Sequence, residues 1–404
     1  MSISRESEAD SFQGGKSFPV ATRPPADLPH VLFLIDQLCE MGGAERIVLN
    51  TIRLLPKDRF RCSLITFKVD PQLPIFADFP CPYQVFPVER TYGFNGIKVA
   101  WKLREFIRRE NVSIVHTFFE TSDLWGGFIS RTAGNVSLVS SRRDMGILRL
   151  RKHDIAYRLM NPWFDLVTTV SEEVRRFCIQ KDNLPPSKVQ TLYNGLEFNK
   201  VDASDVGEDL RLSLGLKPGS QLIATVGHIR RVKGFDVLIE AAAKVIPEFP
   251  TALFLIIGRN SESEHFQELQ ALVTKHGMGA NVRFFGETES IYSLLKASDV
   301  FVLPSRSEGF SNALIEAMAC RLPCVATRVG GNGEAIEEAR SGYLVENEDA
   351  AGMADRILRL LRNPVLAKEM GKAGRKIVEA KFTAEVMMQQ LVGHYDRLLA
   401  ARRN

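Results

Sequence analysis

The sequence contains no apolar segment long enough to cross a membrane. No stretch reaches the roughly 18–20 uncharged apolar residues that a transmembrane helix needs. Residues 1–29 are polar, rich in Pro, Gly and Ser, and lack the apolar core of a secretory signal, so we predict a disordered lead-in. The six cysteines have no paired spacing, which favours a reducing, cytoplasmic compartment over a disulfide framework.

Several catalytic motifs are also missing. There is no P-loop, no zinc-type cluster and no Ser–His–Asp ordering. Because the sequence has no Asp-x-Asp, we do not expect a carboxylate-held divalent metal on a bound phosphate, and no cofactor is predicted. Cys320 and Cys324 have the wrong spacing for a thioredoxin or zinc motif, which favours core packing.

Neither sign of charge predominates, since the sequence has 52 Lys and Arg against 48 Asp and Glu. A net charge of +4 does not indicate a nucleic-acid partner. The charge is uneven, since residues 30–200 hold 24 Lys and Arg against 18 Asp and Glu, whereas residues 201–404 hold 25 against 26. The N-terminal half can therefore meet an anionic substrate, or an anionic membrane if the protein is peripheral on the inner face of the membrane.

Short apolar runs alternate with helical stretches after the lead-in, which indicates parallel sheets covered by helices on both faces. One series fills residues 30–200 and a second fills 201–384, with a polar stretch near 200–220 between them. We predict an α/β fold of two doubly wound, Rossmann-like domains facing a central cleft, and an amphipathic helix over 385–404. The predicted strands are 30–36, 62–67, 112–118, 137–141, 166–170, 189–193, 222–227, 252–258, 282–286, 299–304, 323–327 and 342–345.

A basic loop follows the first strand of the second series, in VGHIRRVKGF (226–235). Arg230, Arg231 and Lys233 lie beside Gly234 and the start of a helix. Fixed positive charge next to the free N–H groups of a helix N-terminus suits a phosphate. A solvated basic turn is the alternative.

The segment EGFSNALIEAMA (308–319) places two carboxylates around a strand–loop–helix junction. Glu308 lies in the loop, Gly309 allows a ligand to approach the backbone closely, and Ser311 or Asn312 can cap the helix that contains Glu316. Both carboxylates can face one cleft and accept hydrogen bonds from sugar hydroxyls. Alternatively, Glu316 pairs with a core arginine and Glu308 is solvated; the spacing does not decide between the two.

Fewer features of the first series suggest chemistry. Gly42 and Gly43 lie between the first strand and the first helix, but they do not form the dinucleotide-binding glycine motif. They form either a backbone loop facing the cleft or a tight turn with close helix packing. His116 ends a strand, where a satisfied core histidine is commoner than a catalytic one.

Basic residues follow the fourth strand of the first series. Arg142, Arg143 and Asp144 are expected near the cleft edge, where they can meet an anionic acceptor. The basic residues from Arg149 to Arg158 can instead touch lipid headgroups. The basic amphipathic helix over 96–110 either packs on the sheet or contacts a membrane.

Taken together and in order, these segments resemble the family-4 retaining glycosyltransferases of the GT-B fold, over about residues 30–400. The segments that carry the resemblance are GGAERIVLN (42–50), TTVSEEVRR (168–176), LYNGLEF (192–198), VGHIRRVKGFDVLIEA (226–241), VRFFGETESIYSLLKASDVFVLPS (282–305), EGFSNALIEAMACRLPCVAT (308–327) and GGNGEAIEEARSGYLV (330–345).

The resemblance implies a retaining, metal-independent hexosyltransferase. It would move a sugar from a nucleotide-sugar donor, such as a UDP- or GDP-sugar, to a glycan or lipid-linked acceptor, as in exopolysaccharide or lipopolysaccharide assembly. The acceptor site would lie in the N-terminal domain, to which the C-terminal helix would cross back. The alternatives on the same fold are a nucleotide-sugar epimerase, a sucrose-type synthase and a non-catalytic scaffold.

The resemblance also implies residue roles. Lys233, with Arg230 or Arg231, would neutralise the donor diphosphate; Glu308 would contact the donor sugar and Glu316 the ribose. The remaining donor-binding residues would be Gly42, Gly43, Phe285, Gly286, Gly309, Phe310, Ser311 and Asn312.

Two positions depart from the family pattern. His228 stands where many members have arginine, which puts the phosphate partner in doubt. The first series has His116 but Phe118 in place of a second histidine, so His116 is the remaining catalytic candidate there.

Overall fold

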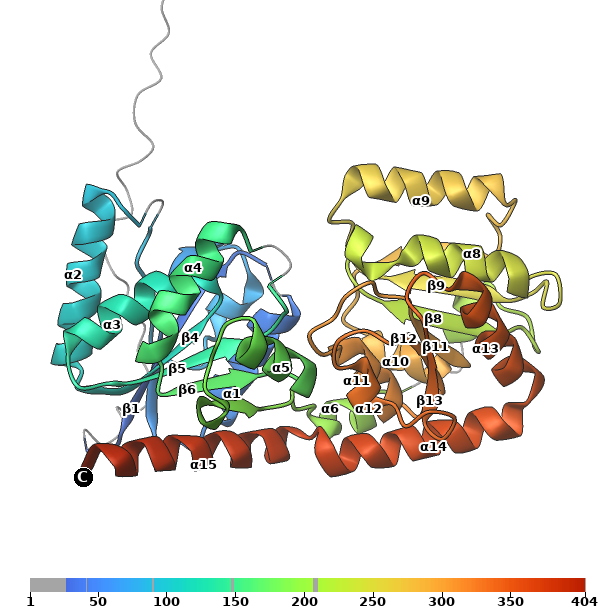
Figure 1. The fold of residues 1–404 in the computed structure, drawn as a ribbon. Coiled ribbons are helices and arrows are strands. Elements are labelled where there is room, and N and C mark those ends of the chain that lie inside the picture. The colour runs from blue at the N-terminus through green and yellow to red at the C-terminus, as the bar shows by residue number, and fades with distance from the viewer. Residues whose placement is uncertain (1–26, 41, 89–90, 147–148, 206–209, 404) are drawn as a thin grey trace, which may run out of the picture. The chain divides into compact units, whose positions relative to one another are not determined.

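The protein contains two parallel sheets, seen in a computed structural model that describes residues 27–40, 42–88, 91–146, 149–205 and 210–403 (Figure 1). Residues 1–26 of the predicted lead-in lie outside the described residues. Unit 1 comprises the chain up to Ser141 with Leu159–Leu166 and Tyr395–Asn404, and unit 2 comprises Arg142–Arg158 and Val167–His394. The predicted domain boundary near residue 200 stays a prediction.

The seven-stranded sheet has the order β3-β2-β1-β4-β5-β6-β7. In β1, the apolar run Val31–Ile35 is fully buried, as in a strand that is covered on both faces. The strands are β1 (His30–Leu38), β2 (Arg61–Val69), β3 (Tyr83–Val85), β4 (Val112–Phe118), β5 (Ser137–Arg142), β6 (Leu166–Thr169) and β7 (Val189–Thr191).

The six-stranded sheet of unit 2 has the order β10-β9-β8-β11-β12-β13. Its strands are β8 (Leu222–Val226), β9 (Leu253–Ile257), β10 (Val282–Gly286), β11 (Val300–Leu303), β12 (Cys324–Thr327) and β13 (Gly342–Val345). All twelve predicted strands are present, so the predicted α/β fold with two doubly wound sheets is confirmed; β3 was not predicted.

In β8, β9, β11, β12 and β13, the side chains that point to either face of the sheet are buried. The edge strand β10 instead exposes Arg283 and Phe285. Ile223, Phe254 and Val302 pack with helices α8 (Phe235–Val245) and α13 (Ala350–Arg362) in one core cluster, while their neighbours Leu222 and Leu303 are buried as well. One face is covered by α8, α13 and α9 (Ser263–Lys275), and the other by α10 (Ile291–Ala297), α11 (Asn312–Ala319) and α14 (Pro364–Lys381) (Figure 1).

The helices follow the strands in the alternation typical of doubly wound folds. They are α1 (Gly43–Leu54), α2 (Phe94–Arg109), α3 (Gly127–Ala133), α4 (Arg151–Met160), α5 (Glu172–Gln180), α6 (Phe198–Ala203), α7 (Leu210–Ser213), α8 (Phe235–Val245), α9 (Ser263–Lys275), α10 (Ile291–Ala297), α11 (Asn312–Ala319), α12 (Asn332–Ala335), α13 (Ala350–Arg362), α14 (Pro364–Lys381) and α15 (Ala384–Arg403).

The last residues of α15 belong to unit 1. Tyr395 is fully buried, and its hydroxyl lies 2.7 Å from Nδ1 of His116 in β4. Arg59 pairs with Asp396 at 2.8 Å, and Arg402 donates hydrogen bonds to backbone carbonyls of unit 1. The C-terminal residues therefore complete the core of this unit.

The buried contact between Tyr395 and His116 should contribute measurably to stability. Tyr395→Phe removes the hydroxyl from a site without water access, so we expect the free energy of unfolding to fall by about 1–2 kcal/mol. Urea denaturation measures the change, with the exposed Tyr92→Phe as control. Equal stability of the two variants would contradict this assignment.

Candidate active site

The order of the six-stranded sheet reverses between β8 and β11, which are neighbours in space but not in sequence. In doubly wound sheets, ligands bind beyond the carboxyl ends of the strands at such a reversal. The loops that leave β8 and β11 are the predicted basic loop and the loop that carries Glu308. The strongest candidate site in unit 2 therefore lies where these two loops meet.

Lys233 and Glu308 form an ion pair across the two loops. Lys233 Nζ lies 2.7 Å from Glu308 Oε1, and Ser305 Oγ donates to the same oxygen at 2.6 Å. The side chains are 25% and 10% exposed, so the pair is partly shielded but accessible. Of the two interpretations of Glu308, the solvated one does not describe this geometry.

Gly234 allows the two loops to approach. Its φ is +64°, and a β-carbon there would lie 2.1 Å from the carbonyl oxygen of Pro304 at the end of β11. Any other residue would push the loops apart and would also be strained at this φ. The short 3-10 turn Arg231–Lys233 ends at this glycine, which places Lys233 next to the Glu308 loop.

Arg306 ties the same two loops together. Its guanidinium binds both carboxylate oxygens of Asp236 at 2.9 and 2.7 Å and donates to the carbonyl oxygen of Arg231 at 2.6 Å. Its backbone N–H donates to the carbonyl oxygen of Val232 at 2.8 Å. Arg306 is not among the predicted site residues, although an arginine in the loop after a strand is a usable signal for such a role.

The backbone around Glu308 is held from several sides within unit 2. A β-carbon on Gly309 would lie 2.0 Å from the carbonyl oxygen of Arg143, and one on Gly330 would lie 1.7 Å from that of Glu308. Gly331 N–H donates to the carbonyl oxygen of Gly309 at 3.1 Å. The group that approaches Gly309 closely is the protein's own backbone, and the approach of a ligand to this glycine stays a prediction.

The start of α11 is held by a side-chain cap and by a network of side-chain hydrogen bonds. Ser311 Oγ accepts from the Leu314 N–H at 3.3 Å, as predicted for a capping residue. Asn194 links two predicted site residues, because its amide donates to Asn312 Oδ1 at 2.6 Å and accepts from Arg143 Nη2 at 2.8 Å. Arg143 and Asn312 thus belong to one polar network.

The other basic residues of the first loop are placed differently from Lys233. Arg231 Nη2 binds Glu268 on α9 at 2.5 Å, and its backbone N–H binds Glu262. Arg230 is exposed at the start of the turn. His228, at the departure from the family pattern, lies 3.3 Å from Ser261 through Nδ1. The structure therefore brings Lys233, and not Arg231, to Glu308.

The predicted nucleoside contacts lie on two elements of unit 2. Glu316 is partly buried in α11. Phe285 and Gly286 end β10, where Phe285 is partly exposed and Gly286 has a φ of +84°. Phe310 is buried and contacts Tyr193 and Phe382 through ring centroids 5.3 and 5.1 Å away. The roles of these residues toward a donor stay predictions.

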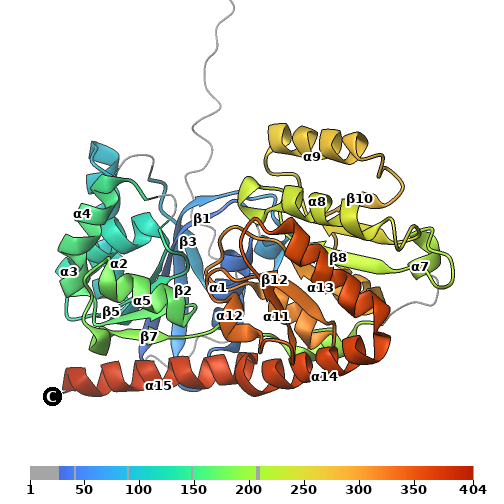
Figure 2. The same cartoon turned by 45° about the vertical axis from the view of Figure 1, so that its right-hand side comes forward.

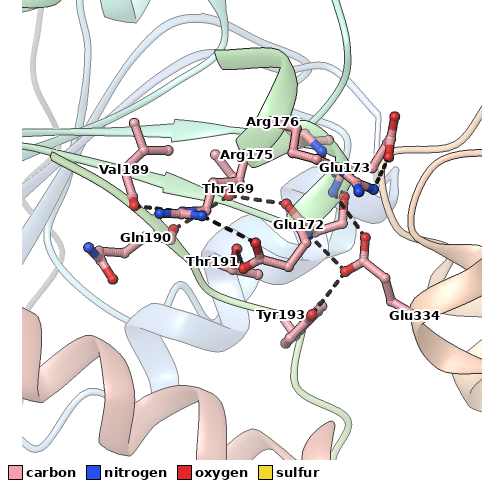
Figure 3. A network of polar contacts seen from close by, with 12 residues as sticks. Thr169, Glu172, Glu173, Arg175, Arg176, Val189, Gln190, Thr191, Tyr193 and Glu334 are labelled. Carbon is pink, nitrogen blue, oxygen red and sulfur yellow. Dashed lines mark hydrogen bonds and ion pairs between the residues drawn. The ribbon is translucent and has the colours of Figure 1, made fainter. Parts of the chain in front are cut away.

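Glu334 occupies the N-terminus of α5 (Figure 3). Its carboxylate accepts from the backbone N–H groups of Glu172 and Glu173 at 2.8 and 3.0 Å, and from the Tyr193 hydroxyl at 2.9 Å. Burial and the hydrogen bond to this carboxylate raise the pKa of Tyr193 well above its ordinary value. Since Gly331 in the same segment binds Gly309, this anchor also holds the Glu308 loop.

Arg142 is buried in a different network. Its guanidinium lies 4.0 Å from the centre of the Tyr157 ring and 3.6 Å from Asp182. Arg149 lies over the same ring and binds Asp182 at 2.9 Å. This placement does not support the predicted contact of Arg142 with an acceptor, or of Arg149 with lipid. Asp144 accepts from the backbone N–H of Gly146 at 2.6 Å.

The remaining predicted residues lie in unit 1. Gly42 precedes α1, and a β-carbon there would lie 2.6 Å from Glu45 Oε2; Gly43 begins the helix. His116 is 2% exposed, hydrogen-bonded to Tyr395 and stacked on Phe118. This is the geometry of a core histidine, and it gives no support to a catalytic role.

Two family models match the chain. Residues 207–377 match the model of the glycosyl transferases group 1, and residues 41–200 match that of glycosyltransferase family 4.

Individual glycosyltransferases and related enzymes are also similar to this chain in sequence or in fold. The chain is 27% identical over 328 residues to N-acetyl-alpha-D-glucosaminyl L-malate synthase of Bacillus anthracis, covering 80% of this chain and 83% of the relative. It is 25% identical over 351 residues to the Escherichia coli UDP-Gal:alpha-D-GlcNAc-diphosphoundecaprenol alpha-1,3-galactosyltransferase, covering 84% and 89%. The crystal structure of Anabaena HepE in complex with UDP superimposes with a TM-score of 0.82 at 21% identity, over 91% of this chain and 100% of that one, which shows the shared fold.

The ion pair between Asp236 and Arg306 should make stability depend on acid pH. Burial raises the pKa of Asp236, but the hydrogen bonds and charge of Arg306 lower it below its ordinary value. The folded state therefore binds the proton more weakly than the unfolded chain. The stabilisation is present at neutral pH and is lost as the pH falls below about 4.

We therefore expect Asp236→Asn to lower the free energy of unfolding at pH 7 by about 1 kcal/mol, or the Tm by about 2–4 °C. The difference from wild type should shrink below about pH 4. Thermal melts across pH measure both, with the exposed Asp355→Asn as control. A pH-independent difference would show that the charge of Asp236 is not the cause.

Removing the Glu334 carboxylate should loosen the N-terminus of α5. Glu334→Ala leaves three donors without their acceptor, so we expect a loss of about 1–3 kcal/mol in the free energy of unfolding. Hydrogen exchange should accelerate at the amides of Glu172 and Glu173. Glu346→Ala, on an exposed carboxylate, is the control. Unchanged exchange at these two amides would rule out the anchor.

Proposed function

Since the chain belongs to the glycosyltransferase family 4 with the GT-B fold, we propose that it is a retaining, metal-independent hexosyltransferase with a nucleotide-sugar donor. It is a glycosyltransferase by family; the donor class, the stereochemistry and the metal independence are our proposals. The acceptor we propose is a glycan or a lipid-linked sugar, in the assembly of a surface polysaccharide or lipopolysaccharide.

The observation that carries the proposal is the ion pair of Lys233 and Glu308 at the strand reversal. An ammonium group has three N–H donors, so Lys233 can hold Glu308 and still donate to a phosphate oxygen. A carboxylate has about four acceptor positions, of which Lys233 and Ser305 share one oxygen. Glu308 can therefore accept from sugar hydroxyls while Lys233 binds the diphosphate.

This arrangement suits departure of a nucleoside diphosphate. The bond from the anomeric carbon to the phosphate oxygen breaks with its electron pair on the diphosphate, where negative charge grows. An acceptor hydroxyl oxygen forms the new bond to the same carbon, and its proton can pass to the departing phosphate oxygen. Lys233 supplies fixed positive charge at that point, and Arg230 on the same turn is the second candidate. We propose that Glu308 positions the sugar and that Glu316 holds the ribose hydroxyls.

The acceptor follows from the relatives rather than from the site. The Escherichia coli relative is named for transfer to a diphosphoundecaprenol-linked sugar. A Staphylococcus aureus relative, 26% identical over 329 residues, is named a capsular polysaccharide biosynthesis glycosyltransferase. Both names favour a growing surface glycan as the acceptor.

A thermal-shift screen with UDP-, GDP- and ADP-sugars tests the donor. A ligand that binds only the native state stabilises it by RT ln(1 + [L]/Kd), so the Tm rises with the logarithm of the ligand concentration once this exceeds Kd. Glu316→Ala should reduce the shift given by the bare nucleoside diphosphate, because it removes the ribose contact. If no nucleotide shifts the Tm of the wild type, the proposed function is wrong.

Turnover of the identified donor tests the ion pair. We expect Lys233→Met and Glu308→Gln to lower kcat/KM by about 100-fold or more. Arg231→Met is the matched control, since its guanidinium pairs with Glu268; Lys233→Arg keeps the charge if the Met variant folds poorly. Wild-type turnover should persist in EDTA, and NMR should show retained anomeric configuration. Conversion of the donor without an acceptor would instead indicate an epimerase.

A further inference from the structure

The outer face of helix α2 carries large apolar side chains. Phe94 is 95% exposed, Ile97 68% and Trp101 65%, and Tyr92 just before the helix is exposed as well. Spacings of three and four residues place Phe94, Ile97 and Trp101 along one stripe of the helix. Apolar side chains gathered in this way on a surface are typical of a binding site.

The opposite face of α2 is already packed in the core of unit 1. Arg104 Nη2 donates to the Thr132 carbonyl oxygen at 3.0 Å, and Arg108 Nε to that of Ala133 at 2.6 Å, which fixes α2 beside α3 (Figure 2). The buried apolar residues of this face are Val99, Leu103, Phe106 and Ile107. The helix is therefore held in place by contacts that do not involve the exposed stripe.

Cations lie among the exposed apolar residues. Lys98 and Lys102 directly follow Ile97 and Trp101 on the exposed side of α2. Arg109 is exposed at its C-terminal end, and Glu105 is the exposed acidic residue of the helix. The outer face of α2 is thus both apolar and net positive, a combination that suits a partner with an apolar interior and a negative surface.

Helix α3, which neighbours α2, adds a second apolar contact on the same unit. Its Phe128 stacks on Trp163 with ring centroids 5.3 Å apart, and both rings are partly exposed. Tryptophan and other aromatic side chains are enriched where protein meets the headgroup region of a bilayer.

We propose that the outer face of α2 docks the protein onto an anionic lipid surface. Phe94, Ile97 and Trp101 would enter the boundary between headgroups and acyl chains, while Lys98 and Lys102 would reach the lipid phosphates. A bilayer deforms around a convex helix face, whereas a protein partner would need a matching groove with acidic edges. No helix among the described residues is long and apolar enough to span a membrane.

The docking goes beyond the proposed function, because sugar transfer from a water-soluble donor does not require it. It adds the location at which a lipid-linked acceptor would be met. The two proposals can also fail separately, since nucleotide binding is tested on unit 2 residues and docking on unit 1 residues.

Sedimentation of the full-length chain with vesicles tests the docking. Vesicles of phosphatidylcholine containing about one third phosphatidylglycerol are compared with pure phosphatidylcholine. We expect the wild type to bind the anionic vesicles preferentially. Phe94→Ser with Trp101→Ser should weaken binding about tenfold or more, and Lys98→Gln with Lys102→Gln about fivefold for each charge removed.

The matched control is Leu212→Ser with Val365→Ser, which removes two exposed apolar side chains from unit 2. This variant should bind vesicles like the wild type, and all variants should keep the wild-type thermal shift with nucleotide. Equal binding to both vesicle types, or undiminished binding of the Phe94/Trp101 variant, would overturn the proposal. The proposal would also be overturned if the wild type were a dimer that bound no vesicles and the Phe94/Trp101 variant were a monomer.

Discussion

No side chain fits at position 234, because its β-carbon would collide with the carbonyl oxygen of Pro304. The close approach of the Gly234 backbone to Pro304 brings the loops after β8 and β11 together at the strand reversal of the six-stranded sheet. Arg306 then holds them from the side through Asp236 and the backbone of the 3-10 turn. The candidate site depends on this approach, since Lys233 precedes the glycine and Glu308 lies four residues beyond the proline.

Several carboxylates of unit 2 pair with a cation near a strand end or with a helix N-terminus. How far each carboxylate is buried distinguishes a structural role from a binding role. Asp182 sits with Arg142 in a shielded cluster, whose charges are satisfied by one another and by an aromatic ring. Glu334 satisfies a helix N-terminus that could otherwise attract an anion. The pair of Lys233 and Glu308 differs because it remains partly exposed and retains spare donors and acceptors. Spare hydrogen-bonding capacity, more than charge, is the reason for which we propose this pair as the donor site.

The sequence predicted the sheets well, because continuous apolar runs are the direct mark of strands buried on both faces. It missed β3 (Tyr83–Val85), a three-residue edge strand without such a run. The loops were harder. Arg231 and Lys233 look alike in sequence, and only the turn that ends at the glycine directs one to Glu268 and the other to Glu308. The partners of Glu334 lie some 160 residues earlier in the chain, so no local pattern could reveal them.

The placement of Tyr395 has a consequence for how the protein is made. Unit 1 begins at the N-terminus, yet a fully buried ring of its core comes from α15, 279 residues after its hydrogen-bond partner His116. During synthesis on the ribosome, the core around the first sheet therefore stays incomplete until α15 has emerged. Such long-range closure slows folding, and it links the completion of the first unit to the successful synthesis of the second.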